Sequence, residues 1–207
     1  MAVVVAVVLI AALTGHSAGP TSPTTTVGGA TDQMGPEGIP LETGTPLAPA
    51  STSATGQTVD GIHCDTSEQA AYHIHTHLSV YVDGQQRPLP AGVGIVEPES
   101  QQTTAGPFDG ASHCYYWLHV HAQDGVIHIE SPTTASYTLG QFFDLWGQPL
   151  GAGRVGPATG TLTVFVDGRP YGGDPRTIVL GSRRDIQIDV GAPGPAPKAV
   201  DWSRSQL

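Results

Sequence analysis

Residues 118–130 read Leu-His-Val-His-Ala-Gln-Asp-Gly-Val-Ile-His-Ile-Glu. Polar and apolar side chains alternate on both sides of Asp124-Gly125, which is the pattern of two β-strands joined by a tight turn. A two-residue loop puts four polar side chains on one face in opposed pairs, His121 with His128 and His119 with Glu130. A three-residue loop over 123–125 would instead mix polar and apolar side chains on each face. The alternation therefore predicts a β-hairpin with a two-residue turn.

The polar face of this hairpin has the composition of a metal site. Opposed side chains on paired strands have Cβ atoms about 4.5–5.5 Å apart, which lets imidazoles converge on one ion. Imidazole nitrogens bind zinc at about 2.0–2.1 Å, and a carboxylate can complete the ligand set. Imidazole suits copper as well, and the Irving–Williams order favours Cu²⁺. We therefore expect a divalent copper or zinc ion to be held by His119, His121, His128 and Glu130.

A second strand with alternating histidines is expected over 71–82. His73, His75 and His77 lie on one face, and the opposite face is mostly apolar, with Tyr72, Ile74, Thr76, Leu78, Val80 and Val82. Asp83-Gly84 follows as a hairpin turn. We expect these three histidines to complete the metal site or to form a second one beside it.

An internal repeat serves as a control on these histidines. Residues 78–84 match residues 162–168 in residue type at every position, which indicates two related strand-turn units. The second copy has Thr159 and Thr161 where the first has His75 and His77. The strand therefore does not need histidine for its structure, and a functional role is favoured.

The two cysteines, Cys64 and Cys114, each precede a predicted strand that carries histidines. An even pair in an exported protein is more often a disulfide than a pair of metal ligands. The bridge would close a loop of about 50 residues and stabilise the fold by roughly 4 kcal/mol. It would also bring the two histidine faces next to each other.

Alternating patterns recur along 61–191, and helical periodicity appears once, over 138–146. The fold class expected is mainly β, an antiparallel β-sandwich or barrel with that one short helix. A short strand around 92–96 is expected to run into a polar loop through Gly110. The segments 19–60 and 192–207 are rich in Pro, Gly, Thr, Ser and Ala, and are expected to be a disordered linker and a disordered tail.

Composition also bears on location and partners. The apolar run within 1–18 has the length of a signal-peptide core, which indicates an exported protein without stable membrane insertion after processing. Lys and Arg number 8 against 18 Asp and Glu, for a formal charge of −10, which repels phosphate backbones. The expected partner is therefore a metal ion and not a nucleic acid.

Four motifs together resemble a family of exported, histidine-rich bacterial proteins with no established activity. These are His-x-His-x-His-Leu at 73–78, the cysteine at 114, Leu-His-x-His-x-x-x-Gly-x-Ile-His-x-Glu-Ser-Pro at 118–132, and Thr-Leu-Gly-x-Phe-Phe-x-x-Trp-Gly at 138–147. His119-x-His121 is also locally similar to the metal motifs of cupins and of α-class carbonic anhydrases. The cupin pattern places its glutamate three or four residues after the second histidine, whereas Glu130 lies further on. The resemblance implies export and adds no activity.

Two classes of function follow from these residues. The first is a binding protein that sequesters or transfers copper or zinc. The second is a metal-dependent enzyme in which three histidines hold the ion and Glu130 acts as base or fourth ligand. The surplus of histidines beyond the three that a catalytic site needs favours binding.

Overall fold

The computed structural model describes residues 33–205 and 207, and its described part is mainly β. The signal-peptide-like segment 1–18 and the first part of the expected linker lie outside these residues. The strands and helices, in chain order, are β1 (Cys64–Asp65), β2 (Tyr72–Val82), β3 (Gln85–Gln86), β4 (Ile95–Thr103), β5 (Gly106–Tyr116), β6 (Leu118–His119), β7 (Val126–Ser131), α1 (Leu139–Trp146), β8 (Leu150–Gly151), β9 (Arg154–Val155), β10 (Ala158–Thr159), β11 (Leu162–Val166), β12 (Arg169–Tyr171), the 3₁₀ turn η1 (Pro175–Thr177), β13 (Arg184–Val190) and the 3₁₀ turn η2 (Trp202–Arg204).

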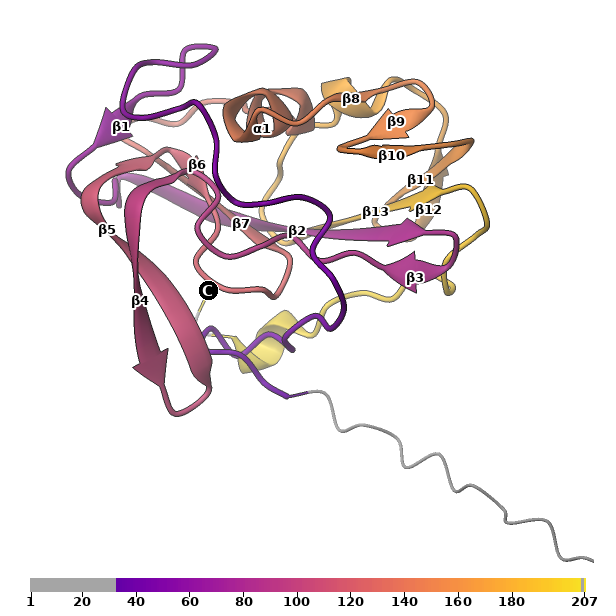
Figure 1. Ribbon diagram of the computed structural model, residues 1–207, viewed down its shortest axis with the longest axis horizontal. Coiled ribbons are helices and arrows are strands. Elements are labelled where there is room, and N and C mark those ends of the chain that lie inside the picture. Colours follow the sequence, from indigo (N-terminus) through magenta and orange to yellow (C-terminus); the bar gives the residue numbers. More distant parts are fainter. Residues whose placement is uncertain (1–32, 206) are drawn as a thin grey trace, which may run out of the picture. The chain divides into compact units, whose positions relative to one another are not determined.

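The largest sheet is built around β2 and has the order β12-β11-β13-β2-β7-β6, with β3 paired to the far end of β2 (Figure 1). Two smaller sheets, β1-β5-β4 and β10-β9-β8, lie beside it, and the sheets form an open, sandwich-like arrangement and not a closed barrel. The mainly β fold is therefore confirmed. The expectation of a purely antiparallel arrangement is wrong at one place, because β13 runs parallel to β2. The chain between these strands is long enough to make the crossover that a parallel pair requires.

One face of strand β2 packs in the apolar core, and the other face carries its histidines. Leu78 and Val80 are almost fully buried in the main core cluster, together with Phe142 and Trp146 of α1. The predicted helix is confirmed: the Thr138 hydroxyl accepts a hydrogen bond from the Gln141 backbone at its start. Helix α1 covers the apolar face of the sheet, so the alternating histidines of β2 point to the opposite face.

Both copies of the repeated unit form the expected turns. Asp83-Gly84 joins β2 to β3, and Asp167-Gly168 joins β11 to β12. All four residues have positive φ angles between 50° and 76°. This geometry is typical of a two-residue type I′ hairpin, for which Asp-Gly is favoured.

The long hairpin β4–β5 replaces the polar loop that was expected through Gly110. The two strands pair from Ile95 with Tyr115 to Thr103 with Gly106, with an irregularity between Val96 and Pro98. The outer part of β4 is exposed on both faces and that of β5 is mostly half-buried, so the sequence of this hairpin carries no clear alternation of apolar and polar residues. The strands were missed for that reason.

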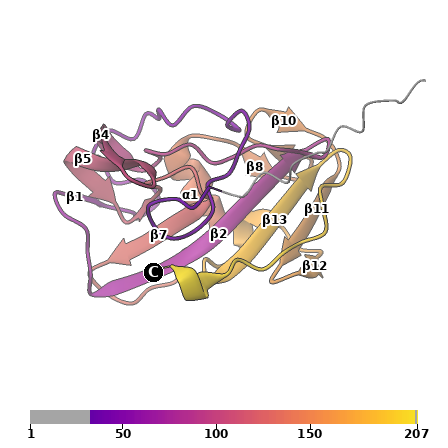
Figure 2. The same cartoon turned by 90° about the horizontal axis from the view of Figure 1, so that it is seen from below.

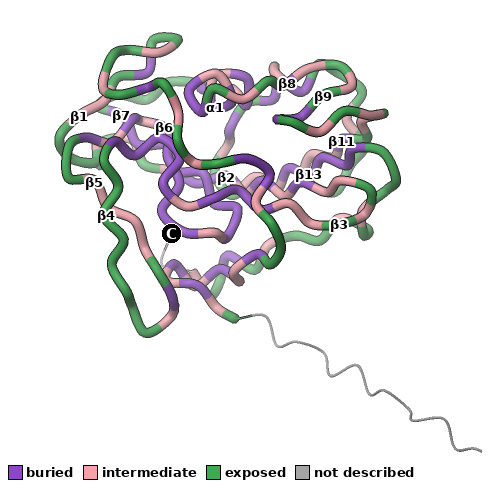
Figure 3. The backbone as a smooth tube through the Cα atoms, in the orientation of Figure 1, coloured by how far each residue is buried: buried purple, intermediate pink, exposed green. Residues whose placement is uncertain are grey.

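The described parts of the two segments expected to be disordered, 33–60 and 192–205 with Leu207, are packed onto the rest of the fold. Ile39 of the first segment is 1% exposed, and Trp202 of the second is 9% exposed. Figure 3 shows buried stretches along the first segment, and Figure 2 shows the C-terminal segment, in which Trp202 is the one buried residue among those described, returning beside β13 and β2. Hydrogen bonds tie the second segment to β13, from Gln187 Nε2 to the Pro195 carbonyl and from the Val200 backbone to Asp185. Few but well-placed apolar side chains, with polar partners on the sheet, make this packing favourable despite the composition.

The predicted disulfide between Cys64 and Cys114 is present and joins β1 to β5 across a sequence separation of 50 residues. Strand β1 is also hydrogen-bonded to β5. The bridge therefore anchors the end of β5 that leads directly into His119 of β6. Within residues 33–205 and 207, no helix is both long and apolar enough to cross a membrane.

Candidate metal centre

The predicted hairpin of residues 118–130 forms with a different register. His119 of β6 lies opposite His128 of β7, whereas the two-residue turn required His121 there. Residues 120–125 form a longer loop, because Val120 exchanges backbone hydrogen bonds with Gly92 and Val93 instead of with β7. The register differs from the predicted one by two residues. A shift of two preserves the face on which each side chain lies, so the expected cluster still forms.

His119 and His121 are oriented by backbone carbonyls of β5. His119 Nδ1 lies 2.8 Å from the Tyr116 carbonyl oxygen, and His121 Nδ1 lies 2.6 Å from that of Asp109. A carbonyl can only accept, so each Nδ1 carries a proton and donates it. The two Nε2 atoms then face each other at 3.0 Å. Two nitrogen lone pairs at this distance repel unless a cation, either a proton or a metal ion, lies between them.

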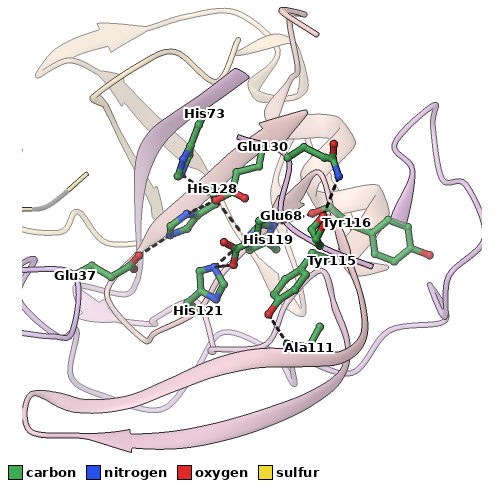
Figure 4. Close-up of polar contacts among 12 residues, drawn as sticks. Glu37, Glu68, His73, Ala111, Tyr115, Tyr116, His119, His121, His128 and Glu130 are labelled. Atoms are coloured by element: carbon green, nitrogen blue, oxygen red, sulfur yellow. Dashed lines mark hydrogen bonds and ion pairs between the residues drawn. The ribbon is translucent and has the colours of Figure 1, made fainter. Parts of the chain in front are cut away.

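His128 and Glu130 of β7 lie at the middle of the cluster (Figure 4). Glu130 Oε1 is 2.9 Å from His73 Nε2 and 3.2 Å from His128 Nδ1. The other nitrogen of His128, Nε2, lies 2.7 Å from Glu37 Oε1 but without the alignment of a hydrogen bond. Both β7 side chains are no more than 4% exposed, so the cluster lies within the protein.

The donor atoms form two overlapping groups in which all ligand atoms lie within 4.8 Å of one another. We call them the inner group, His119, His121, His128 and Glu130, and the outer group, His73, His75, His128 and Glu130. Every member of the inner group is buried, while the side chain of His73 is 39% exposed. Each group has three imidazoles and a carboxylate, and is close enough to hold a metal ion.

Several donor atoms in these groups are buried without a hydrogen-bond partner among residues 33–205 and 207. They are His75 Nε2, His128 Nε2 and Glu130 Oε2, and Glu37 Oε2 beside the cluster is in the same state. A buried polar atom that lacks a partner costs roughly 1–3 kcal/mol. These atoms therefore make the free energy of folding less favourable, and a bound cation would remove that penalty.

The carboxylates and burial set the protonation of the cluster. Burial opposes a charge on His128, but the charge of the adjacent Glu37, together with the hydrogen bond to Glu130 and the charge of Glu130, raises the pKa of His128 to about 10. Burial lowers the pKa of His75 to about 3 and holds that of His119 well below its usual range, and the charge of neighbouring histidines adds to both shifts. Burial would raise the pKa of Glu130, but its histidine partners lower it overall. At neutral pH the cluster thus contains neutral His75 and His119, an imidazolium at His128 and an ionised carboxylate at Glu130.

His77 lies apart from both groups. Its Nε2 is 3.6 Å from Glu42 Oε1, at the edge of a cavity of about 430 Å³ between the sheet and the two terminal segments. Burial lowers the pKa of His77 to about 4 and raises that of Glu42 to about 8, so at pH 7 the contact joins two neutral groups and is not an ion pair. Of the seven predicted ligands, His77 is therefore the one that the structure does not bring to the centre.

Glu42 makes stability depend on pH. Because its pKa is higher in the folded than in the unfolded protein, its favourable contribution is full below about pH 4.5 and is lost as pH rises through about 8. Glu42→Gln, which cannot ionise, should leave stability nearly unchanged at pH 5 and raise it at pH 9, by several kcal/mol at about 1.4 kcal/mol per pKa unit. Thermal melts at both pH values test this, with the exposed Glu99→Gln as control. Equal melting temperatures of parent and Glu42→Gln at pH 9 would contradict it.

Other participants were not predicted from the sequence. Glu37 and Glu42 lie in the segment expected to be disordered, and Glu68, whose Oε1 is 3.3 Å from His121 Nε2, lies in the loop before β2. No side-chain pattern marks the orienting carbonyls of Asp109 and Tyr116, since any residue has one. The alternation in the sequence reveals only ligands whose side chains lie on regular strands.

Comparison of the chain with family models, with curated proteins and with solved structures finds no match. The chemistry of the cluster itself is therefore the basis for assigning a function.

Proposed function

We propose that this protein binds one divalent transition-metal ion, copper or zinc, through the inner group. The observation that carries the proposal is the 3.0 Å contact between His119 Nε2 and His121 Nε2. Two nitrogens bound to one tetrahedral ion at about 2.0–2.1 Å lie about 3.3 Å apart, which is close to this distance. The carbonyl partners of both rings direct the lone pairs to the same point, as the orienting partners of metal-bound histidines do.

The remaining members of the inner group complete the coordination. His128 and Glu130 supply the third imidazole and a carboxylate, and the ion would replace the proton that His128 otherwise carries. With Glu130 and Glu37 both ionised, the charge of a divalent ion would be balanced in the buried site.

This arrangement supports binding over catalysis. A catalytic zinc site keeps one position open for water or substrate, whereas four protein donors close the tetrahedral shell. Glu130, the base in the enzymatic alternative, is 2% exposed and already lies within 4 Å of three imidazoles. These contacts suit a ligand better than a base that must reach a water molecule. We further propose that the protein works in an exported, oxidising location, which its disulfide supports.

Titration of the metal-free protein with Cu²⁺ and with Zn²⁺ tests the function. We expect tight uptake of one ion per chain at pH 7.5 and a rise in melting temperature, because the ligands converge only in the folded state. Calorimetry and thermal melts give both quantities. A protein that takes up neither ion, or whose melting temperature does not respond to either, would refute the proposal.

Glu37→Gln should weaken binding of the ion by about 10- to 100-fold, the usual effect of losing a group that orients a ligand. Glu37 is 2.7 Å from His128 and supplies a charge that balances the ion, but it is not a member of either group. The dissociation constant from competition with a chelator measures the effect, and Glu99→Gln on the exposed part of β4 is the matched control. An unchanged affinity would remove Glu37 from the site.

A further inference from the structure

We infer that the outer group is the loading position for the inner group, so that one ion passes from His73 and His75 to His119 and His121 while His128 and Glu130 remain bound to it. The inference rests on the proposed function. It assigns a task to the two histidines that a closed inner site does not need.

The first argument is the sharing of ligands. His128 and Glu130 belong to both groups, and each group has four donors only when it includes them. His128 normally gives one nitrogen to an ion, so the groups compete for it. The positive charges of two ions this close would also repel, with Glu130 as the one carboxylate within the groups. The two groups are therefore alternative positions for one ion.

The second argument is the gradient of exposure. The side chain of His73 is 39% exposed, that of Glu130 2%, and that of His119 fully buried. His73 and His75 also line a surface cavity of about 400 Å³, next to the exposed Arg183. Figure 4 places His73 on one side of His128 and Glu130, with His119 and His121 on the other. An ion that arrives by this cavity meets His73 before any inner ligand.

The third argument is the continuity of contacts. The rings of His73 and His75 have centroids 4.5 Å apart, His75 and His128 4.5 Å, and His128 and His119 5.2 Å. The buried His75 Nε2 has no hydrogen-bond partner in the part of the chain that the structure describes, so its lone pair can bind an ion. An ion can then move by exchanging two imidazoles for two others, and no step requires a bare ion in the protein interior. Such a path lowers the barrier both to loading and to release.

The test is the rate at which Cu²⁺ quenches tryptophan fluorescence after rapid mixing with the metal-free protein. His73→Ala/His75→Ala should slow both loading and release of Cu²⁺, by about tenfold or more. His77→Ala is the matched control, because His77 lies on the same face of β2 but in neither group, and it should load at the parent rate. His73→Ala alone changes a partly exposed side chain and should show a smaller slowing in a normally folded protein.

Other outcomes overturn the inference. If His73 only orients Glu130, the double variant will load at the parent rate and release faster. If the route passes Glu68, which is 44% exposed beside His121, Glu68→Ala will change the loading rate and the double variant will not. A second ion that binds with similar affinity and depends on His73 and His75 would show two sites instead of two positions. A parent protein that binds no ion would refute the proposed function itself, and this inference with it.

Discussion

His119→Ala/His121→Ala should abolish tight binding of Cu²⁺ and Zn²⁺. The two rings provide half of the donors of the inner group, and their Nε2 atoms are the pair that faces one point. Because the loss of a group that only orients a ligand costs about 10- to 100-fold, the loss of two ligands should cost more than this. Competition titration with a chelator at pH 7.5 measures the change, and any remaining ion should exchange rapidly at the outer group.

The control for this variant must separate lost ligands from lost folding. Both rings are buried and bonded to carbonyls of β5, so their removal leaves space and two carbonyls without donors. His119→Gln/His121→Gln retains polar side chains and should fold with a closer melting temperature while binding as poorly as the alanine variant. Parent-like affinity in both double variants would show that the inner group is a polar network and not a metal site.

Of the substitutions proposed for this protein, removal of the Cys64–Cys114 disulfide should produce the largest loss of folding stability. The bridge closes a loop of about 50 residues, for which chain entropy gives roughly 4 kcal/mol. For a protein of this size, that corresponds to a fall in melting temperature of roughly 10 °C. Thermal melts of Cys64→Ser/Cys114→Ser measure the fall, and His113→Ala, an exposed neighbour of Cys114, is the control.

The same variant should also bind metal less tightly. Strand β5 carries Cys114 and the two carbonyls that orient His119 and His121. Without the bridge this strand keeps its pairing with β4 but loses its covalent tie to β1. A melting temperature and an affinity equal to those of the parent would show that strand pairing alone holds β5 in place.

Alternation in the sequence was sufficient to predict which side chains gather on one face. It placed six of the seven proposed ligands together, because parity survives a register shift of two residues. It failed for His77, which lies on the same face but further along β2, where Gly125 packs against its ring. Alternation predicts the face on which a side chain lies, but not whether two side chains on that face are close enough to share an ion.

The register and the remaining partners depend on contacts between segments that are far apart in the chain. The turn at Asp124-Gly125 was misjudged because Val120 bonds to Val93, about 27 residues away, and not to the neighbouring strand. Glu37 could not be found, because its segment has neither periodicity nor a large apolar content before it meets the sheet. Tertiary contacts of this kind leave little local signal.

The carbonyls of β5 also affect how this site responds to mutation. A substitution at Asp109 or Tyr116 replaces the side chain and leaves the main-chain acceptor in position. The orientation of both imidazoles therefore does not depend on which side chains occupy these two positions. The ligands themselves have no such protection. A single substitution of a ligand can therefore abolish the metal centre. The orientation of the His119 and His121 rings changes only if the backbone of β5 bends. Engineering a different metal preference here should accordingly begin with the path of β5 and not with the identity of its residues.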